Sequence, residues 1–105
     1  MTSTDFNQLV HEVFDKCSNT LLRKADEYTD EDRLSNFKKA ARMAGCTPAQ
    51  ALMGFKLKHD VATQDFVNWD ADGKLIPMEY WTEKVVDSIN YLILLYALVK
   101  DTDDA

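Results

Sequence analysis

Turn-forming residues are scarce in this sequence, which contains only 3 glycines and 2 prolines among 105 residues. Sandwiches and barrels need such residues at intervals of roughly 8–12 residues, so their scarcity argues against an all-β fold. Hydrophobic residues make up 46% of the chain, which is enough for a buried core and excludes wholesale disorder. Because single domains usually contain roughly 100–150 residues, we expect one all-α domain over residues 1–105.

Cysteines and long apolar runs are also few. Cys17 and Cys46 belong to no CxxC spacing and no histidine cluster, so the sequence predicts neither a zinc knuckle nor a disulfide framework. The longest apolar run, Tyr91–Val99, is about half of a membrane span, and the N-terminus lacks an apolar signal region. We therefore expect a reduced, soluble, cytoplasmic protein that does not bind membranes.

Positive charge is in deficit, since 12 Lys and Arg stand against 18 Asp and Glu, for a formal net charge of −6. This balance disfavours a general duplex nucleic-acid binder, whose affinity depends on neutralising phosphates. Eight of the acidic residues lie within 26–32 and 101–104, and the rest of the chain holds 12 basic against 10 acidic residues. The middle of the chain is therefore locally basic and can receive a small phosphate-bearing ligand.

Hydrophobic periodicity predicts four helices, three of them long, that make a four- to five-helix bundle. Their ranges are 4–28, 35–44, 48–69 and 77–100, followed by an acidic tail at 101–105. Ser3 or Thr4 can cap the first helix, and Gly45 can end the second. The third helix has the clearest start, because Thr47 is an N-cap residue and Gln50 can close a capping box.

The last predicted helix is apolar nearly all round except for one polar stripe. Glu83, Asp87 and Asn90 follow one another at steps of four and three, so they share a face of the helix. Carboxylates beside apolar walls are costly to bury unless they are paired, hydrogen-bonded or bound to a metal. Two such oxygen ligands one turn apart suit Mg²⁺, which takes its other ligands from water or phosphate. The alternative is that Glu83 faces solvent and Asp87 pairs with a Lys or Arg of another helix.

The third predicted helix contributes three further candidates, which lie in or beside its apolar sector of Ala51, Leu52, Phe55, Ala62, Phe66 and Trp69. Lys58 is a flexible point charge that can contact a phosphate at the rim of a pocket, and its alternative is a salt bridge to Asp65. His59 lies inside the apolar sector, where it is either a ligand-binding residue or a hydrogen-bonded core histidine.

Residues 24–37, between the first two helices, combine hydrogen-bonding side chains with aromatic ones. Lys24 and Arg33 offer cations for phosphates, Asn36 offers an amide for a base edge, and Tyr28 offers a ring for stacking. These are the groups that a nucleotide pocket needs, although a solvated acidic loop is the alternative. The chain contains no glycine-rich phosphate loop, nucleophile elbow, HExxH or EF-hand pattern, so nucleophilic catalysis has no support.

Taken together, these residues resemble a known family over about residues 20–100. The matching segments are Lys24, Glu27-Tyr28, Asn36-Phe37, Lys58-His59 and the last-helix stretch Glu83–Tyr91. They look like the small phage and prophage proteins grouped as nucleotide modification associated domain 1. That group is similar in turn to the all-α nucleoside triphosphate pyrophosphatases of the MazG and dimeric dUTPase superfamily.

The resemblance implies a MazG-like bundle completed by homo-oligomerisation, as a dimer or a tetramer, in the cytoplasm of a bacterial host. It implies Mg²⁺-dependent cleavage of a nucleoside triphosphate, with Glu83 and Asp87 as catalytic metal ligands, Asp65 as a further ligand and Asn90 orienting a sugar or ligand group. One departure stands out, because the preceding helix lacks the ExxE pair of those enzymes. Losing half of the carboxylates disfavours multi-metal hydrolysis more than it disfavours nucleotide binding.

Two functions therefore remain open at this stage. The first is a Mg²⁺-dependent nucleotide pyrophosphatase-like enzyme. The second is a non-catalytic binder of a nucleotide or signal molecule, or a protein-interaction module of phage origin. Both include self-association, because the apolar run Tyr91–Val99 must be covered on all sides and so short a bundle cannot cover it alone.

Overall fold

The structure is a computed structural model that describes residues 1–27 and 32–104. Within this part the chain is entirely helical and forms no strand, which confirms the expected all-α fold with three long helices and a short one. The helices are α1 (Ser3–Glu27), α2 (Ser35–Ala44), α3 (Pro48–Ala71) and α4 (Met78–Asp104). No helix in the described ranges has both the length and the apolar character needed to cross a membrane.

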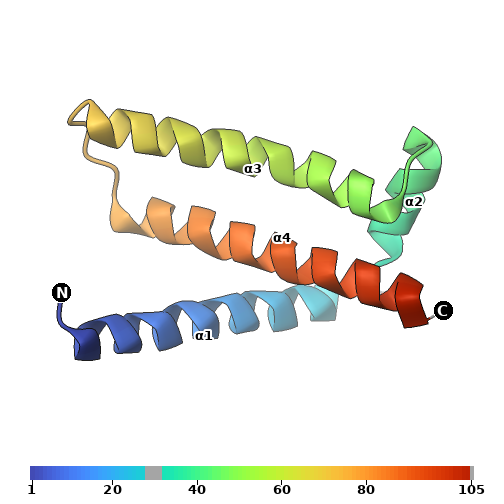
Figure 1. The fold of residues 1–105 in the computed structure, drawn as a ribbon, viewed down its shortest axis with the longest axis horizontal. Coiled ribbons are helices and arrows are strands. Elements are labelled where there is room, and N and C mark those ends of the chain that lie inside the picture. Colours follow the sequence, from blue (N-terminus) through green and yellow to red (C-terminus); the bar gives the residue numbers. More distant parts are fainter. Residues whose placement is uncertain (28–31, 105) are drawn as a thin grey trace.

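The three long helices lie side by side, with α4 between α1 and α3 (Figure 1). α1 runs in the same direction as α4, whereas α3 runs in the opposite direction (Figure 1). The short α2 crosses the end of this layer and packs on α3. α4 is therefore the central element, and its two sides face two different neighbours.

Local signals set most of the helix boundaries as predicted. The capping box at the start of α3 is present, since the Gln50 N–H donates to Thr47 Oγ1 (3.1 Å) and the Thr47 N–H donates to Gln50 Oε1 (3.0 Å). Gly45 ends α2 in the left-handed conformation with φ of 70°. The expected cap of α1, Ser3 or Thr4, was wrong. The cap is Thr2, whose hydroxyl oxygen accepts a hydrogen bond from the Asp5 N–H (3.1 Å).

The predicted acidic tail is instead the last turn of α4, which continues to Asp104. Acidic residues at a helix C-terminus oppose the helix dipole, so this turn needs support from elsewhere. Lys38 of α2 supplies it, with Nζ 2.9 Å from Asp101 Oδ2 and 2.6 Å from Asp32 Oδ2. The hydroxyl of Thr102 also donates to the Leu98 carbonyl (3.0 Å). This tertiary ion pair explains why a tail was the wrong expectation.

The core is small and lies where α2, α3 and α4 meet. Leu34, Leu52 and Leu98 form its buried centre, and the partly buried residues packed on it are Phe37, Tyr91, Leu94, Leu95 and Ala97. α1 contributes Cys17, which is 2% exposed, and burial raises the pKa of its thiol. The apolar sector predicted for the third helix is only partly covered, since Leu52 is buried while Phe55 and Trp69 are about half exposed.

Candidate functional site

The polar stripe of α4 runs from solvent into the interior. Glu83 is exposed, the Asp87 side chain is 21% exposed and Asn90 is 7% exposed. Within the described residues, the Oδ1 atom of Asn90 is buried and receives no hydrogen bond. A buried acceptor without a donor costs about 1–3 kcal/mol, so this end of the stripe is suited to a group that donates a hydrogen bond.

A groove of about 470 Å³ lies between this stripe and α1. On the α4 side it is lined by Glu79, Thr82, Glu83, Val86 and Asp87, and on the α1 side by Lys16, Thr20 and Arg23. The α1 residues follow steps of four and three, so they form one polar face of that helix. Across the described residues, no ion pair joins the cations Lys16 and Arg23 to the carboxylates of the stripe. Opposed and unneutralised charges in one groove fit a ligand that carries both signs, such as a metal-bound phosphate.

Asp87 also lines a second and smaller hollow, of about 90 Å³. Its other lining residues are Leu21, Arg33, Phe37, Asn90, Tyr91 and Leu94. This volume equals about three water molecules, so it can take a small polar group beside the Asn90 amide. Of the predicted site residues, the hollow brings Arg33, Asp87 and Asn90 together.

His59 faces α4 next to the stripe. Its ring lies 5.1 Å from the ring of Tyr91, and its Nδ1 atom is 3.7 Å from Asp87 Oδ2. That separation is too long for a hydrogen bond, and the buried Nδ1 has no hydrogen-bond partner in the part of the chain that the structure describes. The alternative of a hydrogen-bonded core histidine is therefore not met at Nδ1, and a role of His59 in ligand binding stays a prediction. The predicted pairing of Asp87 with a Lys or Arg is likewise replaced by this histidine contact.

Several predicted residues lie away from the groove. Lys58 and Asp65 are exposed on α3 and form no ion pair with each other, and neither lines the groove or the smaller hollow. Asn36 is exposed on α2 and is also outside both. Tyr28 and the side chain of Lys24 lie outside the described residues.

The arrangement does not assemble a many-ligand metal cluster. In the part of the chain that the structure describes, no three His, Cys, Asp or Glu side chains are placed to hold one ion. Glu83 and Asp87 share the groove, but Asp65 does not join them. Mg²⁺ needs only one or two protein carboxylates when waters and phosphate oxygens complete its shell, so the pair on α4 fits this ion.

Lys16, Thr20 and Arg23 were not identified from the sequence as site residues. The only sequence feature that could have indicated them is their spacing of four and three residues, which is also the spacing of the stripe on α4. An amphipathic helix has many polar positions with this spacing, and only the packing of α1 on α4 selects the face that meets the carboxylates.

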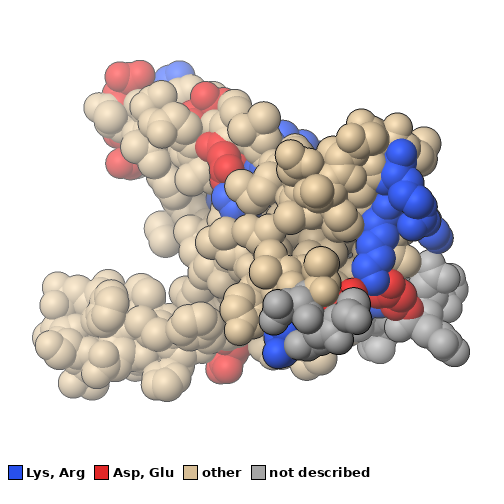
Figure 2. All heavy atoms as spheres, turned by 45° about the vertical axis from the view of Figure 1, so that its right-hand side comes forward, with Lys and Arg blue, Asp and Glu red and all other residues tan. Residues whose placement is uncertain are grey.

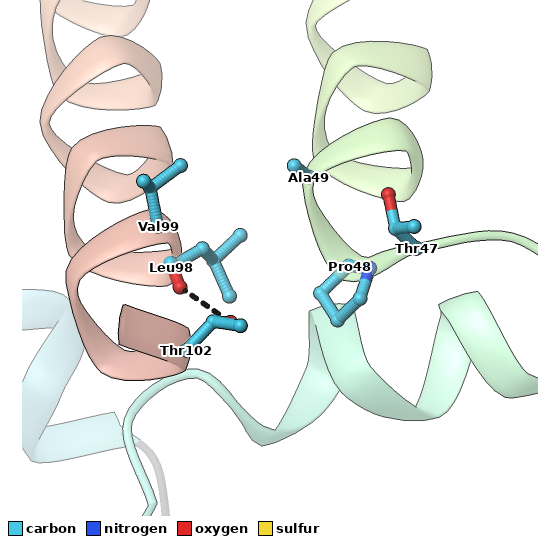
Figure 3. Close-up of a pocket in the computed structure, with 6 residues that line it drawn as sticks. All are labelled: Thr47, Pro48, Ala49, Leu98, Val99 and Thr102. Atoms are coloured by element: carbon cyan, nitrogen blue, oxygen red, sulfur yellow. Dashed lines mark hydrogen bonds between the residues drawn. The ribbon is translucent and has the colours of Figure 1, made fainter. Parts of the chain in front are cut away.

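A third hollow, of about 570 Å³, lies where the start of α3 approaches the end of α4 (Figure 3). Its lining residues are Thr47, Pro48, Ala49, Leu98, Val99 and Thr102, none of which has an ionisable side chain. The Thr102 hydroxyl already donates to the Leu98 carbonyl, as the dashed line marks. This hollow can accept apolar groups but offers no acid, base or cation.

No family model, curated protein or solved structure matches the chain.

Proposed function

We propose that the protein binds a magnesium-complexed nucleotide, or a related phosphate-bearing small molecule, in the groove between α1 and α4. The observation that carries the proposal is the position of Asp87, which lines both the charged groove and the smaller hollow, and Asn90, whose Oδ1 is unpartnered among the described residues, also lines that hollow. A nucleotide needs both surroundings, since its phosphates require positive charge while its sugar or base requires directed hydrogen bonds beside aromatic rings.

Each side chain has a role that follows from its chemistry. Glu83 and Asp87 would hold Mg²⁺ through their carboxylates, and the ion would neutralise phosphate charge. Lys16 and Arg23 would contact phosphate oxygens from the opposite side of the groove. Asn90 would accept a hydrogen bond from a sugar hydroxyl or a base amino group.

The residues of α3 favour binding over hydrolysis. Asp60 is held by Lys56, whose Nζ is 2.6 Å from Asp60 Oδ1, and Asp65 is exposed away from the groove. Water activation on a triphosphate normally takes more than one pair of metal-binding carboxylates. Hydrolysis is the second candidate, with water attacking the α-phosphorus and pyrophosphate leaving. His59 favours it, because a histidine beside a carboxylate is a common general base.

The remaining parts of the proposal rest on the resemblance to nucleotide modification associated domain 1 and the MazG-like enzymes. They are a cytoplasmic protein of phage or prophage origin, which acts as a homo-oligomer, either a dimer or a tetramer. Neither a membrane nor duplex nucleic acid is part of the proposed ligand set.

Calorimetric titration with natural and modified nucleoside triphosphates, with and without Mg²⁺, tests the proposal. We expect Mg²⁺-dependent binding that Asp87→Asn weakens about 10-fold or more, because the variant loses a metal-binding charge. Asp65→Asn is the matched control, since this exposed carboxylate lies outside the groove.

Pyrophosphate release in the same mixtures separates the two candidates, and release that disappears in Asp87→Asn would establish hydrolysis. A folded protein that binds none of the nucleotides would contradict the proposal.

A further inference from the structure

The chain is too extended for a compact single domain. Its radius of gyration is 16.2 Å, whereas a compact domain of this length has about 13 Å. Its accessible surface is 7769 Å², and a folded monomer of this mass exposes about 6,000 Å². The excess of about 1,800 Å² lies within the range that each subunit of a permanent homodimer buries.

Among the described residues, one face of α4 carries an apolar row that the neighbouring helices leave largely uncovered. Val85, Ile89, Leu92, Tyr96 and Val99 follow one another at steps of four, three, four and three, and we name this row the α4 seam. The exposed fractions are 42% for Val85, 52% for Leu92, 72% for Tyr96 and 56% for Val99, while Ile89 is half-buried. This alternation is the spacing by which two helices pair.

Apolar residues of α1 extend the same surface. Phe14 and Leu22 are 58% and 66% exposed, and with Ile93 they line a hollow of about 410 Å³ that contains no charged side chain. Ile93 follows Leu92 directly, so this hollow adjoins the α4 seam. Figure 2 shows the N-terminal part of α1 as a projecting arm whose visible face carries little charge. Helices α1 and α4 of a second copy would cover this surface as well as the seam.

The chemistry of the surface selects a second copy as its occupant. The residues that flank the centre of the seam are Val86, Ser88, Ile93 and Leu95, none of which is charged. A partner of opposite charge therefore has nothing to recognise, and two identical surfaces meet without repulsion. A parallel pairing would bring the acidic residues of 101–104 and two like helix ends together, whereas an antiparallel pairing separates them.

We infer that two copies of this chain form a dimer through the α4 seam, antiparallel about a two-fold axis near Leu92, with α1 of each copy covering the flanks. A two-fold axis makes such a contact self-complementary, because each side presents the same residues. Leu92 lies two residues after Asn90, which is about 200° around the helix. The seam therefore faces away from the polar stripe, and the dimer leaves the nucleotide groove open. The inference rests on the homo-oligomer of the proposed function, for which it names the interface, and it does not depend on nucleotide binding.

Light scattering coupled to size-exclusion chromatography of the full chain tests the inference. The expected mass is twice the 12.0 kDa of one chain, and Leu92→Glu is expected to give the single-chain mass because it places like charges at the axis. Leu57→Glu is the matched control, since Leu57 is 61% exposed on α3 and should leave the dimer intact. A tetramer that Leu92→Glu reduces to smaller species also supports the seam.

Leu92→Cys keeps the test decisive even where the charged variant fails to fold. Under mild oxidation it is expected to give a disulfide-linked dimer, because the axis brings the two copies of residue 92 together. Leu57→Cys should stay unlinked. A wild-type protein that is monomeric at about 100 μM would overturn the inference, since permanent dimers bind far more tightly than that. A Leu92→Glu variant that keeps the wild-type mass would also overturn it.

Discussion

At the scale of single residues, Asn90 shows the clearest conflict between position and chemistry. Its side chain is buried, yet within the described chain its Oδ1 receives no hydrogen bond. Native proteins pair most buried polar atoms, and the exceptions concentrate where the atom serves another purpose. The unpaired oxygen therefore supports the proposal of a ligand that donates a hydrogen bond to it.

We expect Asn90→Leu to separate stability from binding. The midpoint of thermal unfolding should stay equal or rise, because the substitution removes an unpaired polar atom and the neighbouring 90 Å³ hollow offers room. Nucleotide affinity should fall about 10-fold, as expected for a lost hydrogen bond of about 1.4 kcal/mol. Thermal denaturation and calorimetry measure the two effects, and Asn68→Leu at an exposed position of α3 is the control. A large fall in thermal stability would identify Asn90 as a structural residue.

The residues of the site differ in how far the sequence could predict them. The stripe of Glu83, Asp87 and Asn90 was predictable, because its spacing fixes one helix face and its surroundings are apolar. Lys16 and Arg23 were not, since their role depends on which helix α1 meets. Lys58 was predicted at the rim of a pocket because it borders the apolar sector of the third helix, but its side chain lies on the exposed side of α3.

At the scale of helices, boundaries were predicted well wherever the start and stop signals are local. α2 and the start of α3 are examples, because Gly45 and the Thr47 capping box lie within a few residues of the ends they set. The end of α4 was missed, because its support comes from Lys38 on another helix. Long-range ion pairs leave no mark in the local sequence.

Lys38 also gives the stability of the helix ends a defined pH dependence. Its hydrogen bonds to Asp32 and Asp101 raise the pKa of Lys38, and the bond from Lys38, with a second from the Leu34 N–H, lowers the pKa of Asp32. Because folding lowers the pKa of Asp32, its carboxylate stabilises the fold at pH values above the ordinary pKa of about 3.9. This stabilisation is lost as pH falls through the folded pKa. Because folding raises the pKa of Lys38, its ammonium group stabilises the fold at pH values below the ordinary pKa of about 10.4. This stabilisation is lost as pH rises through the folded pKa.

We therefore expect Lys38→Met to be less stable than the wild type at pH 7, with the difference shrinking below about pH 4. Thermal unfolding at a series of pH values measures this difference. Lys58→Met is the control, since Lys58 is exposed and has no ion pair with any described residue. An unchanged difference at low pH would mean that the carboxylates do not stabilise the fold through Lys38.

At the scale of the whole molecule, the sequence predicted the fold class but not the arrangement. Periodicity identifies the apolar side of each helix, yet it does not state that α4 lies between α1 and α3 or that α2 crosses their end. It also overestimated the core, because Phe55 and Trp69 share the sector of Leu52 but remain about half exposed. Three helices in one layer cannot enclose every apolar face that the sequence provides.

Stability should therefore depend on protein concentration. If the α4 seam pairs two copies, association stabilises the folded chain, and the unfolding midpoint should rise as concentration increases. Leu92→Glu should abolish this dependence, while Leu57→Glu should retain it. Thermal unfolding over about a 100-fold range of concentration measures the effect. A midpoint that stays constant for the wild type would contradict the dimer.

The central place of α4 has a consequence for how this protein can evolve. Within 27 residues the helix supports α1, meets α3, presents the polar stripe and exposes the seam. Substitutions there would fail for different reasons on different faces, by loosening a neighbour, by removing a ligand contact or by separating two subunits. Substitutions would therefore be tolerated mainly on the outer side of α3.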